Sequence, residues 1–189
     1  MNRTADVVIV GAGVIGSATA FELAKRGYKT LNIDKLPASG YGSTSNSCAI
    51  VRAHYSTWDG VAMAYEGFFY WDDWNKYLEV EDERGMAKYM KTGSIMFMLK
   101  GADHSKKSLN LFKEIGVEHE IWDLETLKKK MPIYSHDSYN GTSRPDEDDS
   151  FFDKSGDQIE GAVWTPGSGY VSDPQLATHN LQVCLLYTS

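Results

Sequence analysis

Three glycines near the N-terminus, Gly11, Gly13 and Gly16, have the spacing G-x-G-x-x-G. Gly11 permits a tight turn, Gly13 lets the backbone approach a phosphate, and Gly16 lets a helix pack closely on the preceding strand. The N–H groups at the start of that helix carry a partial positive charge that favours phosphate. The spacing therefore predicts a pyrophosphate site.

An acidic residue, Asp34, follows Gly16 by eighteen residues. A carboxylate at this distance accepts hydrogen bonds from a ribose diol and repels a 2′-phosphate, which disfavours NADP. The pattern alone does not distinguish NAD from FAD, and a βαβ unit without any dinucleotide is the remaining alternative.

The flanking segments have the patterns needed to position these groups. Residues 7–10 form a β-branched run, typical of a strand buried on both faces of a parallel sheet. A helical stretch at 17–26 follows, with Gly27 where a helix C-cap belongs, and residues 30–33 form a second predicted strand. Together they predict a βαβ unit.

Farther along, residues 36–48 are rich in Gly and Ser and predict a loop, whereas 59–78 carries an apolar stripe with helical spacing. The acidic segment 134–158 fails the EF-hand pattern, because aligning Gly156 with its invariant glycine puts Phe151 and Ala162 at ligand positions. We expect a surface insertion there and no metal. The other predicted elements are strands at 92–99, 117–122 and 159–164, and helices at 104–115, 124–131 and from Pro174 through Leu181.

Composition excludes several classes of protein. The net charge, 19 − 26 = −7, argues against nucleic-acid or anionic-membrane partners, and 42% hydrophobic with 24% charged residues is typical of a globular protein. Two cysteines, Cys48 and Cys184, are too few for a disulfide framework. The longest apolar stretch, 7–21, is too short and too glycine-rich to span a membrane, so we expect a cytoplasmic protein.

The C-terminal helical pattern ends near Val183 without a cap. Residues 184–189 resemble translated adapter read-through, so we expect a non-native tail and a gene that continues elsewhere. A doubly wound sheet needs more parallel strands than the two predicted here. We therefore expect a C-terminally truncated chain that is inactive by itself.

The Gly/Ser stretch 42–47, followed by Arg52-Ala53-His54-Tyr55, resembles the loop after the second strand in FAD-dependent amine and amino-acid oxidoreductases. These form the D-amino-acid oxidase, sarcosine oxidase and dimethylglycine dehydrogenase superfamily. Three further segments resemble this superfamily as well: Thr92-Gly93-Ser94, the helix at 109–117 with the residues that end it, and the stretch 161–174. The resemblance covers nearly all of residues 5–183.

The resemblance implies an α/β fold in which a Rossmann-like FAD-binding domain is intertwined with a mixed-sheet α+β substrate domain. Residues 1–90 and 165–183 would form the first, and 91–164 the second. It also implies a small amine or amino-acid substrate, oxidised at a C–N bond by hydride transfer to flavin. The implied FAD-binding residues are Gly11, Gly13, Val14, Ile15, Gly16, Asp34, Lys35, Ser43 and Thr44.

Arg52 falls where sarcosine-oxidase-like members place an arginine that pairs with the substrate carboxylate, for which a guanidinium is the natural bidentate partner. A surface or ion-paired arginine is the alternative. Ala49 stands where these members have a second basic residue, and Thr44-Ser45 replaces neighbouring histidines. These departures put sarcosine itself and covalent flavin attachment in this loop in doubt.

The less specific side chains have ordinary interpretations. We expect His54 to be a neutral histidine packed near the loop, Cys48 a small buried side chain, and Trp71 and Trp74 core or domain-interface residues. Two other functions stay open: an NAD-dependent dehydrogenase built on the same βαβ unit, and a non-catalytic dinucleotide-binding subunit. The Gly/Ser loop disfavours the first, and Arg52 disfavours the second.

Overall fold

The structure is a computed structural model that describes residues 4–188 apart from 102, 140–143 and 145. The chain forms two compact units. The first unit comprises 1–51, 66–91 and 169–189, and the second comprises 52–65 and 92–168. Residues 52–65, expected in the first domain, belong to the second unit because their side chains and backbone bond to its sheet and helix, as described below.

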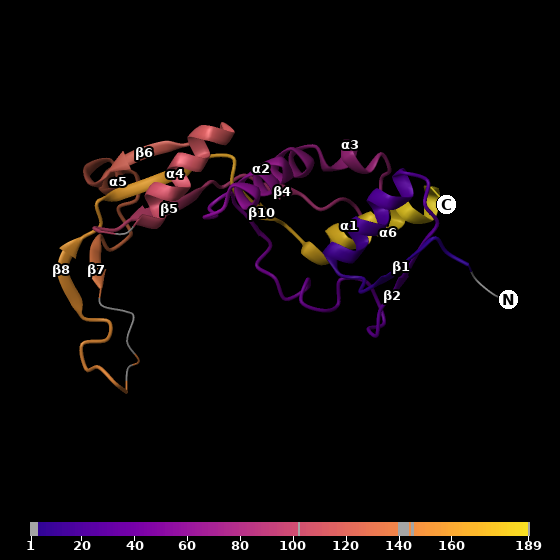
Figure 1. Cartoon of the computed structure of the whole chain (residues 1–189), viewed down its shortest axis with the longest axis horizontal. Helices are drawn as coiled ribbons and strands as arrows, with labels where there is room; N and C mark the ends of the chain where they lie inside the picture. The colour runs from indigo at the N-terminus through magenta and orange to yellow at the C-terminus, as the bar shows by residue number, and fades with distance from the viewer. Residues whose placement is uncertain (1–3, 102, 140–143, 145, 189) are drawn as a thin grey trace. The chain divides into compact units, whose positions relative to one another are not determined.

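The βαβ unit is present in the first unit. Strand β1 (Val7–Val10) pairs in parallel with β2 (Thr30–Ile33), and helix α1 (Val14–Lys25) connects them. The helix begins at Val14, three residues earlier than expected, because Gly13 serves as its N-cap. Helix α6 (Pro174–Thr188) packs against α1, as Figure 1 shows.

The expectation that β1 is buried on both faces is wrong. Val8 and Val10 are 56% and 83% exposed. Among the described residues this parallel sheet has two strands, and α1 covers one of its faces. The other apolar face is therefore open, since nothing described packs on it.

The helix expected over 59–78 is two helices, α2 (Trp58–Asp72) and α3 (Trp74–Leu78). The break lies at Asp73, whose φ of −124° and ψ of 47° are not helical. Trp71 and Trp74 stack with their ring centroids 4.4 Å apart, which confirms their packing role. The core of this unit consists of Phe21, Trp74, Leu78, Ala87, Val171, Ala177, Leu181 and Cys184.

Helix α6 does not end near Val183, where the sequence pattern fades. It continues to Thr188, and the Cys184 side chain is buried in the core. Burial raises the pKa of the Cys184 thiol to about 11. The first unit also contains a small antiparallel sheet that the sequence did not predict, with strand order β3 (Ile50–Val51), β10 (Gly169–Val171), β4 (Tyr89–Met90).

The second unit is built on an antiparallel sheet in which β9 (Gly161–Thr165) lies between β5 (Ser94–Met98) and β6 (Glu120–Asp123). Helix α4 (Asp103–Ile115) packs on β5, and α5 (Leu124–Lys130) packs on β6 and β9 (Figure 1). Asp123 caps α5 by accepting the Thr126 N–H at 2.8 Å.

The segment expected as a surface insertion contains a two-stranded antiparallel ribbon, β7 (Asp137–Tyr139) with β8 (Lys154–Gln158). Every residue of β8 is exposed. No group of His, Cys, Asp and Glu side chains within the described ranges could hold a metal ion. None of the helices described is long and apolar enough to cross a membrane.

Candidate functional site

The glycine turn after β1 is closed by backbone contacts. Gly11 has a φ of +110°, a value that glycine adopts readily, and its N–H donates to the Ile33 carbonyl at 2.7 Å. A Cβ added to Gly16 would lie 2.0 Å from the Gly11 carbonyl oxygen. The first strand, the turn and α1 are therefore in contact only because Gly16 has no side chain.

Asp34 lies at the end of β2, beside this turn. Its carboxylate accepts the Ala12 N–H at 2.7 Å and the Leu36 N–H at 2.9 Å, and these two hydrogen bonds lower its pKa. The ionised group is thus held in one orientation, with lone pairs left for a ligand. A cavity of about 390 Å³ is lined by Val10, Gly11, Ile33, Asp34 and Lys35.

The loop at 36–48 is attached to the start of α1. Thr44 is buried, and its Oγ1 accepts the Val14 N–H at 3.1 Å. The Gly40 N–H donates to the Ala12 carbonyl at 2.8 Å. Thr44 therefore caps the helix, a role the sequence did not indicate, whereas Ser43 and Ile15 are exposed.

These residues fit a pyrophosphate. The N-cap Gly13 makes no side-chain hydrogen bond, and the first turn of α1 contains no acidic residue that would repel an anion. The Ser17 hydroxyl, in the same turn, is buried and has no described hydrogen-bond partner. The first turn thus leaves the Ile15 N–H and the Ser17 hydroxyl for a ligand beside a fixed carboxylate, as a dinucleotide requires, while the Val14 N–H donates to Thr44.

Arg52 lies in the second unit and lines a different cavity, of about 370 Å³. Its side chain is exposed and forms no ion pair with any residue that the structure describes. The exposure agrees with the alternative of a surface arginine, whereas an ion-paired Arg52 finds no support in this part of the chain. The lining residues are Arg52, His54, Tyr55, Ser56, Ser94, Ile95, Met96 and His104.

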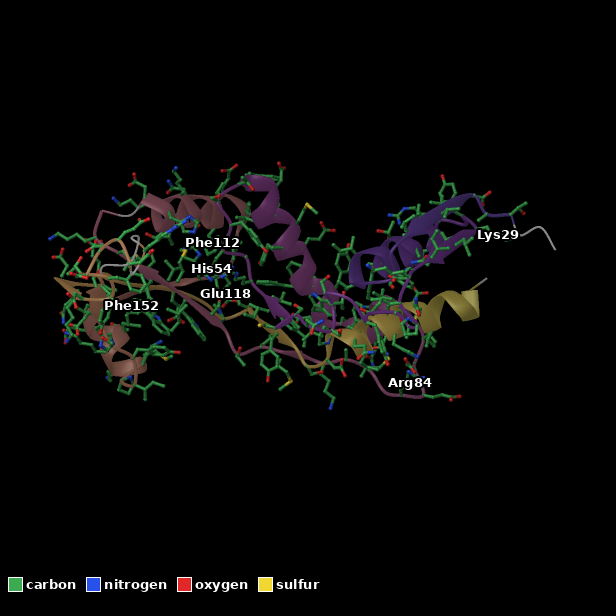
Figure 2. The ribbon with its side chains drawn as sticks, turned by 90° about the horizontal axis from the view of Figure 1, so that it is seen from below. Lys29, His54, Arg84, Phe112, Glu118 and Phe152 are labelled. Carbon is green, nitrogen blue, oxygen red and sulfur yellow. The ribbon has the colours of Figure 1, made fainter. Side chains whose placement is uncertain are left out.

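His54 is the polar centre of this cavity. Its Nε2 lies 2.7 Å from Ser94 Oγ and 2.8 Å from Thr165 Oγ1, and its ring packs 5.4 Å from that of Phe112 (Figure 2). Burial lowers the pKa of His54 to about 4, with smaller contributions from Arg52 and His104. The expected packing of this histidine is confirmed, and the lowered pKa favours its neutral form.

The sequence did not reveal the two hydroxyls that hold His54. Ser94 and Thr165 are 71 residues apart and meet only because β5 and β9 pair with these residues opposite each other. The only available signal was a hydroxyl residue near one end of each of the two predicted strands.

One expectation about the loop is wrong. Cys48 is exposed, because the backbone after Ser47 turns toward β3 and leaves its side chain in solvent.

We expect the pH dependence of stability to show the titration of His54. Its folded pKa of about 4 is below the ordinary value of 6.5, so the unfolded chain binds the proton more tightly. This contribution to the free energy of unfolding is fully present above pH 6.5 and declines as the pH falls toward 4. Urea unfolding of the parent and of His54→Gln should differ in slope by about one proton in that window. Identical pH profiles would contradict the buried neutral imidazole.

The comparison with protein families decides which dinucleotide this site takes. A family described as FAD dependent oxidoreductase matches residues 6–185. The chain belongs to the FAD-dependent oxidoreductase family. The cofactor of the family is therefore FAD, which removes the NAD-dependent alternative and agrees with the Asp34 and Gly/Ser loop arrangement.

Several curated relatives are named as sarcosine oxidases. A putative sarcosine oxidase of Caenorhabditis elegans is 31% identical over 147 residues, covering 77% of this chain and 36% of the relative. The monomeric sarcosine oxidase of Bacillus sp. (strain B-0618) is 29% identical, with 77% and 37% covered. The chain thus spans about a third of the length of these relatives.

Solved structures confirm the fold. The L-proline dehydrogenase from P. horikoshii matches with a TM-score of 0.74 at 20% identity, covering all of this chain and 43% of that one. The glycine oxidase from Geobacillus kaustophilus matches with a TM-score of 0.67 at 22% identity, covering 97% and 45%. The expected α/β fold with an FAD-binding Rossmann-like domain is that of the family.

Proposed function

We propose that the protein containing this chain oxidises the C–N bond of an amino acid or an N-methylated amino acid. The observation that carries the proposal is Arg52, an exposed guanidinium that lines a cavity without a counter-ion among the described residues. A cation left unpaired in this way is suited to an anionic ligand. Family membership supplies the redox chemistry, and the names of the relatives support amino-acid substrates.

The first unit would hold the cofactor through the residues that the sequence singled out. The Ile15 N–H in the first turn of α1, reached because Gly13 lacks a side chain, would bind the pyrophosphate, whereas the Val14 N–H donates to Thr44 Oγ1. Asp34 would accept hydrogen bonds from the adenosine ribose, with Lys35 and Ser43 beside the cofactor. Thr44 supports this arrangement indirectly, because it keeps the loop attached to the helix start.

Arg52 would orient the substrate. A bidentate pair between the guanidinium and the substrate carboxylate fixes the position and the plane of the carboxylate, which restricts where the Cα–N bond can lie. When bound, the flavin supplies the hydride acceptor for the substrate C–H bond. The substrate nitrogen then forms a C=N bond, and water hydrolyses the imine outside the redox step.

The departures from sarcosine-oxidase-like members support a substrate other than sarcosine. Ala49 cannot provide the second cation, and it has a φ of +51°, an uncommon conformation for a residue with a side chain. His104, which lines the Arg52 cavity, is the other basic side chain available there besides His54. We therefore propose a substrate that carries a carboxylate, and we leave the substituents on its amine nitrogen unspecified.

The proposal predicts a flavoprotein that amino acids reduce. The full-length protein, purified without added cofactor, should show the visible absorbance of oxidised flavin. Under anaerobic conditions a panel of amino acids and N-methyl amino acids should include members that bleach it. The matching amines without a carboxylate should bleach it far more slowly, because Arg52 then has no partner. A protein that carries flavin but is bleached by no member of the panel would contradict the proposal and favour a non-catalytic subunit.

A further inference from the structure

The segment that carries Arg52 has no regular structure. Strand β3 ends at Val51 and helix α2 begins at Trp58, so no ladder of backbone hydrogen bonds holds the residues between them. A guanidinium binds a carboxylate in a planar, bidentate geometry, and small displacements of its backbone therefore cost affinity. Something other than secondary structure must hold Arg52 in place.

Three contacts immediately after Arg52 provide that attachment, all within the second unit. The His54 ring contacts both hydroxyls of the Ser94–Thr165 cross-strand pair. Ala53 is fully buried. The Tyr55 carbonyl accepts a hydrogen bond from Ser108 Oγ of α4 at 3.1 Å. The chain is thus bonded to both the sheet and the helix within three residues of Arg52.

The hydroxyl network assigns the proton on His54. Thr165 Oγ1 donates to the Ser94 carbonyl at 3.3 Å, so the Thr165 oxygen is free to accept. The Nδ1 atom of His54 is buried and has no hydrogen-bond partner among the described residues. An unpartnered acceptor is tolerated better in the interior than an unpartnered N–H. The neutral ring therefore carries its proton on Nε2 and donates it to the hydroxyl pair.

This protonation state separates the roles of the basic groups around the cavity. His54 uses its donor within the protein and carries no charge, so it does not compete for an anionic ligand. Arg52 is exposed and forms no ion pair with any described residue, so its guanidinium donors remain for a ligand. His104, from α4, is the third basic residue that lines the cavity.

We propose that His54 is a positioning residue, which clamps the Arg52 segment to the Ser94–Thr165 pair and so fixes the guanidinium for a substrate carboxylate. The inference rests on the proposed function and adds to it the residue that sets the geometry of carboxylate binding. His54 offers no hydrogen bond to the substrate, because its Nε2 is bound to the hydroxyl pair and its Nδ1 is buried.

The test uses the full-length flavoprotein and acetate as the carboxylate probe, with acetamide as its uncharged counterpart. His54→Phe keeps a ring against Phe112 but removes the donor, and His54→Gln restores an N–H of similar reach. Thr165→Val removes one hydroxyl of the pair with little change in shape. Ser155→Ala, which removes an exposed hydroxyl bonded to the Ser138 carbonyl on the β7–β8 ribbon, is the control in the same unit.

We expect His54→Phe and Thr165→Val to raise the acetate inhibition constant and the amino-acid KM about 3- to 10-fold, as expected for a lost hydrogen bond. The kcat, the flavin content and the inhibition by acetamide should change less than 2-fold. His54→Gln should recover most of the acetate affinity, and Ser155→Ala should resemble the parent.

Two outcomes would overturn the inference alone, and a third would overturn the proposed function with it. One is an unchanged acetate constant in His54→Phe while Arg52→Met raises it, which would leave the proposed function standing. The other is a loss of kcat, flavin and folded protein in parallel, without recovery in His54→Gln, which would make His54 a general stability residue. If Arg52→Met also leaves the acetate constant unchanged, the carboxylate role of Arg52 fails, and with it the inference.

Discussion

Gly16→Ala is expected to abolish FAD binding and to destabilise the first unit. The new Cβ would lie 2.0 Å from the Gly11 carbonyl oxygen, so either the turn or α1 must move. Forced overpacking of this kind typically costs about 1–3 kcal/mol of unfolding free energy. The movement also displaces the α1 N–H groups on which the phosphate site depends. Flavin content after purification and the urea midpoint measure the two effects.

Matched glycine variants separate these effects. Gly67→Ala, within α2, meets no atom within 4 Å and should stabilise the protein by about 0.5–1 kcal/mol. Gly13→Val places its Cβ only 3.0 Å from Thr44 Oγ1 and in the phosphate position, so it should fold but purify without flavin. A Gly16→Ala protein that remains yellow, with the urea midpoint of the parent, would show that the turn does not bind the cofactor.

Arg52→Met is expected to raise the KM for an amino-acid substrate about 30- to 5000-fold in the full-length protein. Methionine keeps much of the length of the side chain but loses the charge-assisted bidentate pair, a loss typically worth 2–5 kcal/mol. Because the flavin site lies on other residues, the flavin content should equal that of the parent. Steady-state kinetics with one amino acid and its decarboxylated amine give the ratio that measures the effect.

Two further variants make this result specific. Arg52→Lys keeps the charge without the planar fork and should recover only part of the lost efficiency. Arg144→Met, at an exposed arginine of the second unit whose ion pair with Glu147 is 3.9 Å long, should behave as the parent. Equal kcat/KM for Arg52→Met and the parent would assign Arg52 a structural role and would contradict the proposed substrate orientation.

The local features of the fold were predictable from the sequence because short-range chemistry determines them. The β-branched run, the glycine spacing and Asp34 predicted β1, the turn and β2 at the correct residues, since each depends on neighbours in one βαβ unit. Arg52 was predictable as a candidate from its place after the Gly/Ser loop. The sequence patterns also predicted β5, α4 and α5 to within a few residues.

Only the tertiary structure decided what lies beside these residues. Strands β3, β4 and β10 have two or three residues each, too few to show a period, and form because distant segments pair. The exposure of Val10 depends on what covers the sheet, which the composition of the strand does not encode. The clamp on the Arg52 segment requires His54 to contact a pair of hydroxyls whose residues are 71 positions apart in the sequence. Thr44 likewise caps α1 by bonding to a residue 30 positions away in the sequence. Such contacts depend on long-range packing, because no local preference of His, Ser or Thr specifies a partner so far away in the chain.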